Sequence, residues 1–210
     1  MINSLPALVW AANLADLELH TFLHRMPKID QPTVLAFDLD PGAPADIVAC
    51  CDVALRLRGL LDRVGLQSFA KTSGSKGLQV YVPLNTAVTY DRTKAFALAV
   101  ASLLERQSPR TVVSKMSKAL RKGKVLVDWS QNQSHKTTVA VYSLRAKERP
   151  LVSTPVTWKE VEGAFQGNGP KRLEFEPPGV LERVEKQGDL FARVLSLKQK
   201  LPPTTAVDSE

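Results

Sequence analysis

The stretch Val34-Leu35-Ala36-Phe37-Asp38-Leu39-Asp40-Pro41 decides the fold that this sequence predicts. An apolar run that ends in Asp-x-Asp is typical of a buried strand with two carboxylates at its end. Residues i and i+2 of a strand share one face, so Asp38 and Asp40 should project together, with Leu39 turned into the packing. Two close carboxylates favour a bound divalent cation. Because Asp is also common where a strand ends in a turn, this stretch alone leaves both interpretations open.

Length and composition predict a single domain over residues 1–200, followed by a disordered tail over 201–210. The net charge of +7 favours a polyanionic partner. The two cysteines, Cys50 and Cys51, are adjacent, which argues against a structural disulfide and for a reducing cytosol. No apolar run has the length needed to cross a membrane, and the first residues lack the basic start of a signal peptide. We therefore expect a cytoplasmic protein with no membrane partner.

Hydrophobic periodicity predicts a mixed α/β chain of the α+β type. Helices are expected at 5–19, 44–64, 91–106, 158–165 and 179–199. Strands are expected at 34–41, on both sides of the loop in 66–84, at 125–129 and at 137–145. The expected architecture is a mostly antiparallel sheet that carries the acids at its strand ends, with helices on the outside.

A polar loop, Lys71–Gly77, joins two of these strands with two glycines, two lysines and three hydroxyls. Such a loop can present backbone N–H groups and positive charge to a phosphate. The spacing of a Walker A loop is absent, and a flexible hairpin loop would have the same composition.

The run Val125–Trp129 repeats the pattern of an apolar strand that ends in an acid, here Asp128. This third carboxylate could complete the ligand set of the first two. The next strand has Lys136 at its start and Arg145 at its end. Three carboxylates, a glycine-lysine loop and two cations form the inventory for metal-assisted nucleotidyl transfer.

Residues 106–124 form the densest basic stretch of the chain and contain no acid. Such a run is often a solvated face, but the absence of acids favours contact with backbone phosphates. The candidate DNA-binding residues are Arg110, Lys115, Lys118, Arg121, Lys122 and Lys124.

Six motifs, in order, make the chain resemble the polymerase domain of bacterial ligase D, a member of the archaeo-eukaryotic primase superfamily. They are Val9-Trp10-Ala11-Ala12-Asn13, Glu18-Leu19-His20, Phe37–Pro41, Lys71–Leu78, Val127–Asn132 and Tyr142–Ala146. The resemblance covers residues 5 to about 200. It implies a primase-polymerase core that serves non-homologous end joining in bacteria.

The resemblance also implies roles for matching positions. Asp38, Asp40 and Asp128 would be catalytic and hold two divalent metals, manganese in preference to magnesium. The residues implied to contact the incoming nucleoside triphosphate are His20, Ser73, Lys76, Gln79, Lys136 and Arg145. The implied activity is DNA-dependent addition of nucleotides, often ribonucleotides, at DNA ends or gaps. The implied partners are DNA ends or gapped DNA, Ku and a separately encoded ligase, and the implied location is the nucleoid.

Two departures from the family pattern leave alternatives open. Gln79 stands where the family has a histidine, and glutamine cannot carry positive charge. The family domain usually has a further segment before the position of Met1, so we expect this chain to lack the N-terminal portion. The chain could therefore be a weakened or inactive DNA-end or nucleotide-binding module, or a split subunit. A haloacid-dehalogenase-type phosphatase also begins with a strand and Asp-x-Asp, but Gly42 stands where that motif needs Thr or Val.

Overall fold

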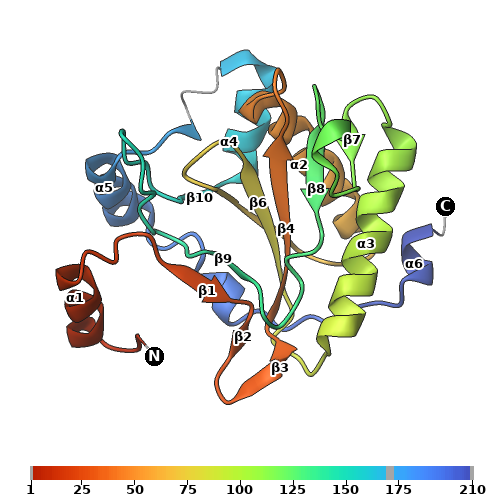
Figure 1. Ribbon diagram of the computed structural model, residues 1–210. Coiled ribbons are helices and arrows are strands. Elements are labelled where there is room, and N and C mark those ends of the chain that lie inside the picture. The colour runs from red at the N-terminus through yellow and green to blue at the C-terminus, as the bar shows by residue number, and fades with distance from the viewer. Residues whose placement is uncertain (1, 169–172, 209–210) are drawn as a thin grey trace.

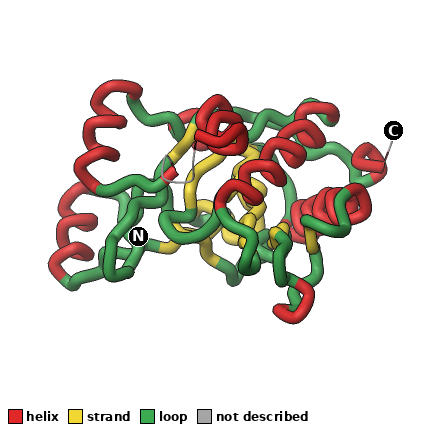
Figure 2. The backbone as a smooth tube through the Cα atoms, turned by 90° about the horizontal axis from the view of Figure 1, so that it is seen from above, coloured by secondary structure: helices red, strands yellow, loops and turns green. Residues whose placement is uncertain are grey.

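The computed structural model describes residues 2–168 and 173–208. A central sheet of six strands has the order β10-β5-β6-β4-β8-β7, and every neighbouring pair is antiparallel except β7 and β8. Its strands are β4 (Val34–Pro41), β5 (Phe69–Thr72), β6 (Leu78–Pro83), β7 (Val112–Val113), β8 (Val125–Asp128) and β10 (Pro155–Val156). Figure 2 shows the strands in the middle of the molecule with helices on the outside. The predicted fold class, a mostly antiparallel sheet flanked by helices, is confirmed.

Strand β4 separates two layers of packing because its side chains alternate between the two sheet faces. Leu35, Phe37 and Leu39 enter the main core, which lies under α2 (Ile47–Arg63) and α3 (Tyr90–Gln107). Ala36 enters a smaller cluster on the other face, beside the aspartates. The carboxylates therefore stand on the sheet face opposite the core that packs under the two long helices.

Both long helices begin at side-chain caps. The carboxylate of Asp46 accepts from the backbone N–H groups of Val48 and Ala49 at the start of α2 (3.0 and 3.3 Å). The hydroxyl of Thr89 accepts from the backbone of Arg92 at the start of α3. Around the sheet lie α4 (Trp158–Gly163), a π-helical turn (Ala164–Asn168), α5 (Pro177–Gln187), the 3₁₀ turns Lys118–Leu120 and Ala192–Leu195, and α6 (Thr205–Asp208).

Two small ladders lie in front of the central sheet (Figure 1). Strand β1 (His20–Phe22) pairs with β9 (Thr137–Val139), and β2 (His24–Arg25) pairs with β3 (Lys28–Pro32). Helix α1 (Leu5–Asn13) lies to one side of them, with most of its apolar side chains exposed.

Several boundaries differ from the sequence predictions. The expected helix 179–199 ends at Gln187, because Gly188 takes a positive φ of 70° that stops the helix. The expected strand 137–145 is a strand only over Thr137–Val139, with one isolated antiparallel bridge farther on, between Leu144 and Val152. The expected disorder of 201–210 is wrong for the described part of that segment, 201–208, since Leu201 and Val207 are buried in the main core and α6 packs against α3. Residues 209–210 lie outside the described part. No helix in the described ranges has the length and apolarity to span a membrane.

Candidate nucleotide and metal site

The three predicted carboxylates lie on two neighbouring strands. Asp38 and Asp40 follow each other on one face of β4, and the β4–β8 pairing sets Asp38 directly opposite Asp128. Directly opposite residues of an antiparallel pair have their Cα atoms about 4.5–5.5 Å apart. The strand register therefore brings Asp128 next to Asp38, and its place in a ligand set with Asp38 and Asp40 stays a prediction.

The same row continues across the sheet. Asp38 pairs with Gln79 on β6, and Gln79 pairs with Lys71 on β5. The Gln79 amide donates to the Asp38 carboxylate. The Lys71 ammonium is buried, donates to the Ser153 hydroxyl (2.6 Å) and lies over the ring of Tyr81 (5.5 Å to its centroid). Four strands thus contribute acid, acid, amide and ammonium to one continuous row.

Burial and like charge disturb the acid–base balance of this row. The pKa of Asp38 is raised to about 7, mostly by burial and then by the charges of Asp40 and Asp128, while the Gln79 hydrogen bond and the Lys71 charge oppose the rise. Burial also lowers the pKa of Lys71 to about 7. When Asp38 is ionised, the negative charges of the three aspartates are therefore not balanced by the positive charge beside them.

The donor set fits divalent metal ions. Carboxylate oxygens are the ligands that Mg²⁺ and Mn²⁺ prefer, and the raised pKa of Asp38 indicates a cluster that a cation would relieve. Asp128 is turned partly toward its own loop, where it accepts from the Ser130 backbone (2.7 Å) and the Gln131 amide (3.0 Å). Within the described ranges no three His, Cys, Asp or Glu side chains are gathered closely enough to form a ready metal cage. Asp38 and Asp40, which both line the cavity, are thus the first candidate ligands, and Asp128 is the third candidate, opposite Asp38 on β8.

A cavity of about 300 Å³ opens above the row. Seven of the predicted site residues line it: His20, Asp38, Asp40, Ser73, Lys76, Gln79 and Arg145. Asp128 and Lys136 do not line it, and the Lys136 ammonium instead donates to the Ser130 hydroxyl (2.5 Å). Gln131 and Thr138 complete the wall from the β8–β9 side.

The glycine-lysine loop is a folded turn. The Ser73 hydroxyl accepts from the backbone N–H groups of Ser75 (3.2 Å) and Gly77 (3.1 Å). Gly74 has a φ of +66°, which L side chains rarely adopt. A Cβ on Gly77 would lie 2.0 Å from the Leu39 carbonyl oxygen. The glycines thus let the loop pass close to β4, where it can face the aspartates.

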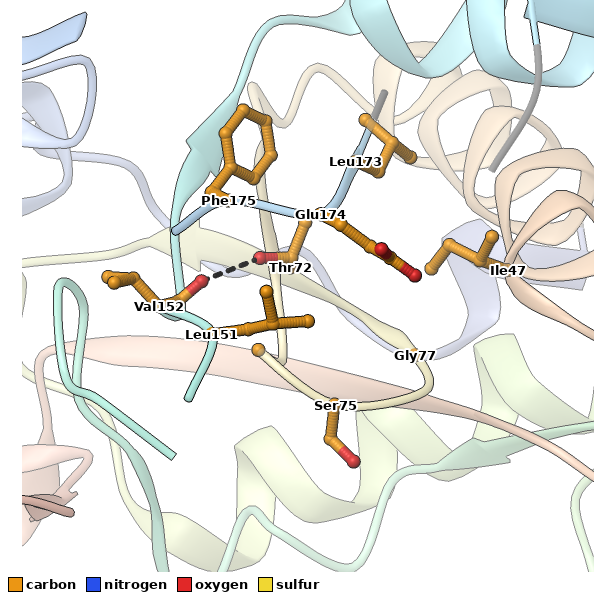
Figure 3. A pocket seen from close by; sticks show the side chains of 10 residues that line it. Ile47, Thr72, Ser75, Gly77, Leu151, Val152, Leu173, Glu174 and Phe175 are labelled. Carbon is orange, nitrogen blue, oxygen red and sulfur yellow. Dashed lines mark hydrogen bonds between the residues drawn. The ribbon is translucent and has the colours of Figure 1, made fainter. Parts of the chain in front are cut away.

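A second, much smaller space lies behind the loop (Figure 3). Its volume of about 30 Å³ is enough for one or two water molecules. The Thr72 hydroxyl donates to the Val152 carbonyl across it (3.3 Å), and Leu173 and Phe175 cover it from the other side. Because Ser75 lines both spaces, this apolar backing supports the loop from behind.

Glu18 connects two residues that line the cavity, His20 and Arg145, and was assigned no role from the sequence. Its carboxylate contacts the His20 ring (3.0 Å) and the Arg145 guanidinium (3.4 Å), and it accepts from the Ala146 backbone (2.7 Å). That backbone bond and the bond from His20 lower the pKa of Glu18. The sequence feature that could have identified Glu18 is its position in the Glu18-Leu19-His20 motif.

Asn132 and Lys71 were also given no role, although both lie in recognised motifs. The side chain of Asn132 is fully buried and bonds both the N–H and the C=O of Ala36 on β4 (3.0 and 2.8 Å). It thereby fixes the loop after Asp128 to the strand that carries the other two acids. Lys71 could be recognised only from the sheet register, because its position relative to Asp38 depends on two strand pairings.

The predicted DNA-binding stretch lies beside the carboxyl end of β4. The backbone of Gly42 donates to the Lys124 carbonyl (2.8 Å) and faces the Arg121 carbonyl closely. The Arg121 guanidinium donates to the Met116 carbonyl (2.6 Å), and the Lys124 ammonium to that of Pro109 (2.6 Å). Of the six candidate DNA-binding residues, four have exposed side chains: Arg110, Lys115, Lys118 and Lys122. DNA contact by this stretch stays a prediction.

Comparison with known proteins agrees with this geometry. Residues 1–191 match the family model described as LigD, primase-polymerase domain. The multifunctional non-homologous end joining protein LigD of Mycolicibacterium smegmatis is 40% identical over 91% of this chain and 25% of its own length. The bifunctional LigD of Bacillus subtilis is 31% identical over 90% of the chain and 30% of its own length. The chain thus spans about a quarter of the length of these curated relatives.

One solved structure gives the same result in three dimensions. The polymerase domain of Mycobacterium tuberculosis ligase D, in complex with DNA, superposes with a TM-score of 0.84 and 38% identity. The match covers 94% of this chain and 70% of that domain. The chain belongs to the LigD primase-polymerase domain family.

Proposed function

We propose that this domain adds nucleotides to DNA ends or gaps during non-homologous end joining. The observation that carries the proposal is the row Asp128–Asp38–Gln79–Lys71 beneath a cavity lined by cations. The names of its LigD relatives and the DNA in the M. tuberculosis structure support it. Ku, a separate ligase and a preference for ribonucleotides are parts of the same proposal, with the bacterial nucleoid as the place of action.

The acidic and the basic residues of the site have different proposed roles. Asp38, Asp40 and Asp128 would hold two divalent ions, Mn²⁺ or Mg²⁺, which supply charge neutralisation for phosphoryl transfer. Arg145 and Lys76, with the N–H groups of the glycine loop, would bind the triphosphate. Glu18 keeps Arg145 and His20 oriented toward the cavity. Lys136 would act indirectly, by fixing the Ser130 hydroxyl beside the Asp128 loop.

Single-nucleotide addition on a gapped, 5′-phosphorylated DNA with Mn²⁺ tests the proposal. The wild-type protein should add one nucleotide, and ribonucleotides should be used in preference to deoxynucleotides. Asp38→Ala should abolish addition while the protein stays folded, and Asp62→Ala, an exposed aspartate at the end of α2, should not. Retained metal-dependent addition by Asp38→Ala would contradict the assignment.

One observation favours a second candidate, a binding module or split subunit without activity of its own. Gln79 occupies the centre of the row, where it bonds Asp38 but brings no charge to a triphosphate. Charge-assisted hydrogen bonds are about twice as strong as neutral ones. If wild-type protein binds DNA without adding nucleotides, and Gln79→His restores addition, the defect lies at this residue. If neither adds nucleotides while DNA still binds, the second candidate replaces the first.

A further inference from the structure

An exposed aromatic residue, Phe22, comes two residues after His20, which lines the nucleotide cavity. His20 and Phe22 are two residues apart on β1, so their side chains share a face, and the chain then bends at the buried Leu23 before His24 begins β2. The Phe22 ring is 49% exposed and stacks on the His24 ring (centroids 4.9 Å apart, planes 15° apart). His24 is held in place by a bond to the Tyr90 hydroxyl (2.8 Å). The packing of the core does not explain a supported, exposed ring at this place.

A basic groove continues from this segment. Its volume is about 510 Å³, and it lies between the β2–β3 hairpin, the residues around Asn85 and the segment 195–198. Three exposed cations line it, Arg25, Lys28 and Lys198, and no Asp or Glu is among its lining residues. The Asn85 amide fixes one wall by donating to the carbonyls of Val194 and Leu197. A groove with this charge fits a polyanion.

The segment β1–β2 connects the cavity, the ring and the groove along the chain. His20 lines the nucleotide cavity and Arg25 lines the groove, with Phe22 between them in the sequence at the end of β1. Stacking platforms beside a basic groove are the general means of binding single strands.

We propose that Phe22 and the groove formed by Arg25, Lys28 and Lys198 bind a single-stranded DNA segment that leaves the site, such as a template overhang. Phe22 stacks on a base, and the three cations contact phosphates. The inference rests on the proposed function only in taking DNA as the ligand, and it requires no nucleotide addition. An acidic peptide would use the cations without the ring, which the test below separates.

Binding of fluorescein-labelled DNA, followed by anisotropy without nucleotide, tests the proposal. Three primer-template duplexes share one sequence and carry a blunt end or a single-stranded overhang of about four or about ten nucleotides. The variants are Phe22→Ala, Phe22→Tyr and the double Lys28→Glu/Lys198→Glu. Matched controls are Phe165→Ala, an exposed ring, and Lys159→Glu, an exposed cation on α4, both far along the chain from β1.

The wild-type protein should bind overhang DNA more tightly than blunt DNA. Phe22→Ala should lose about five-fold to one-hundred-fold in affinity for overhang DNA only, and Phe22→Tyr should retain it. A 2-aminopurine base in the overhang should be quenched by wild type and not by Phe22→Ala. The double variant should reduce the slope of log affinity against log salt by about two.

Three results would overturn the proposal. Equal affinity of wild type for blunt and overhang DNA would remove the single strand as the occupant. Equal binding by Phe22→Ala and Phe165→Ala would remove the stacking role. Loss of overhang binding in the double variant with no effect of Phe22→Ala would leave only a basic surface, open to any acidic partner. If nucleotide addition fails in every assay while overhang binding behaves as expected, the proposed function fails and this inference stands.

Discussion

Asp38→Asn should make the metal-free protein more stable, and the gain should grow with pH. The pKa of Asp38 is raised from 3.8 to about 7, so the folded protein holds this proton more tightly than the unfolded chain does. Stability is therefore lost as the pH rises from about 4 to about 7, while the carboxylate of the folded state is forced to ionise. The amide of asparagine has no such proton to lose.

The structure also sets the magnitude. A tenfold change in proton affinity corresponds to about 1.4 kcal/mol, so the full linkage is worth about 4 kcal/mol. Because Asp38 lies at the floor of an open cavity, solvent screening should reduce this to about 2 kcal/mol. For a protein of this size that corresponds to an increase in Tm of about 4–8 °C. The gain should be near zero at pH 4 and complete at pH 8.

Urea unfolding in a buffer with a chelator, at pH 4 and pH 8, measures the difference. Glu182→Gln, which alters an exposed carboxylate on α5, is the matched control and should leave the curve unchanged. Added Mn²⁺ at pH 8 should stabilise wild type, by about 2.7 kcal/mol at one hundred times its Kd, and Asp38→Asn much less. Parallel pH curves for wild type and Asp38→Asn would refute the argument that buried like charges prepare this site for metal.

Other predictions concern the supports of the site. Gly77→Ala should cost more than about 2 kcal/mol in unfolding free energy, because its Cβ would lie 2.0 Å from a backbone oxygen of β4. Gly59→Ala on α2, with nothing within 4 Å of its Cβ, should stabilise by about 0.5–1 kcal/mol, and equal effects in thermal unfolding would refute the close approach. Asn132→Ala should lower the free energy of unfolding by about 2–3 kcal/mol, because it leaves two backbone groups of β4 unpaired. A smaller decrease in urea unfolding would show that the loop rearranges to pair these two groups. The pKa of Lys71 is lowered to about 7, so stability should rise with pH from about 7 to 10.5. Lys71→Met should therefore stabilise the protein at pH 6 and not above pH 10. Equal stability of the variant and the wild type at both pH values would contradict this prediction.

The sequence predicted the parts of the site that depend on local pattern. Val34–Pro41 is a strand because its apolar run and the turn after it allow nothing else, and alternation then fixes Asp38 and Asp40 on one face. The capping box of Thr157 and Glu160 at the start of α4 is a local feature of the same kind. Such features need only neighbours in the chain.

The missed parts depend on contacts between distant segments. Lys71 joins the row through two strand pairings, and nothing in its own neighbourhood shows that its ammonium is buried. Segment 201–208 looked disordered because it is short and partly polar, yet Leu201 and Val207 fill a gap in the main core. The break at Gly188 in the C-terminal helix was hidden by apolar residues that continue the helical spacing on both sides.

The most direct test of the central claim is manganese-dependent addition of one nucleotide to a gapped DNA by wild type and by Asp40→Asn. Asp40 is exposed at the edge of the cavity, so its amide should leave the fold intact while it removes a metal ligand. We predict addition by wild type and none by Asp40→Asn, with equal unfolding temperatures in a chelating buffer. Equal addition by both proteins would contradict catalysis on these aspartates.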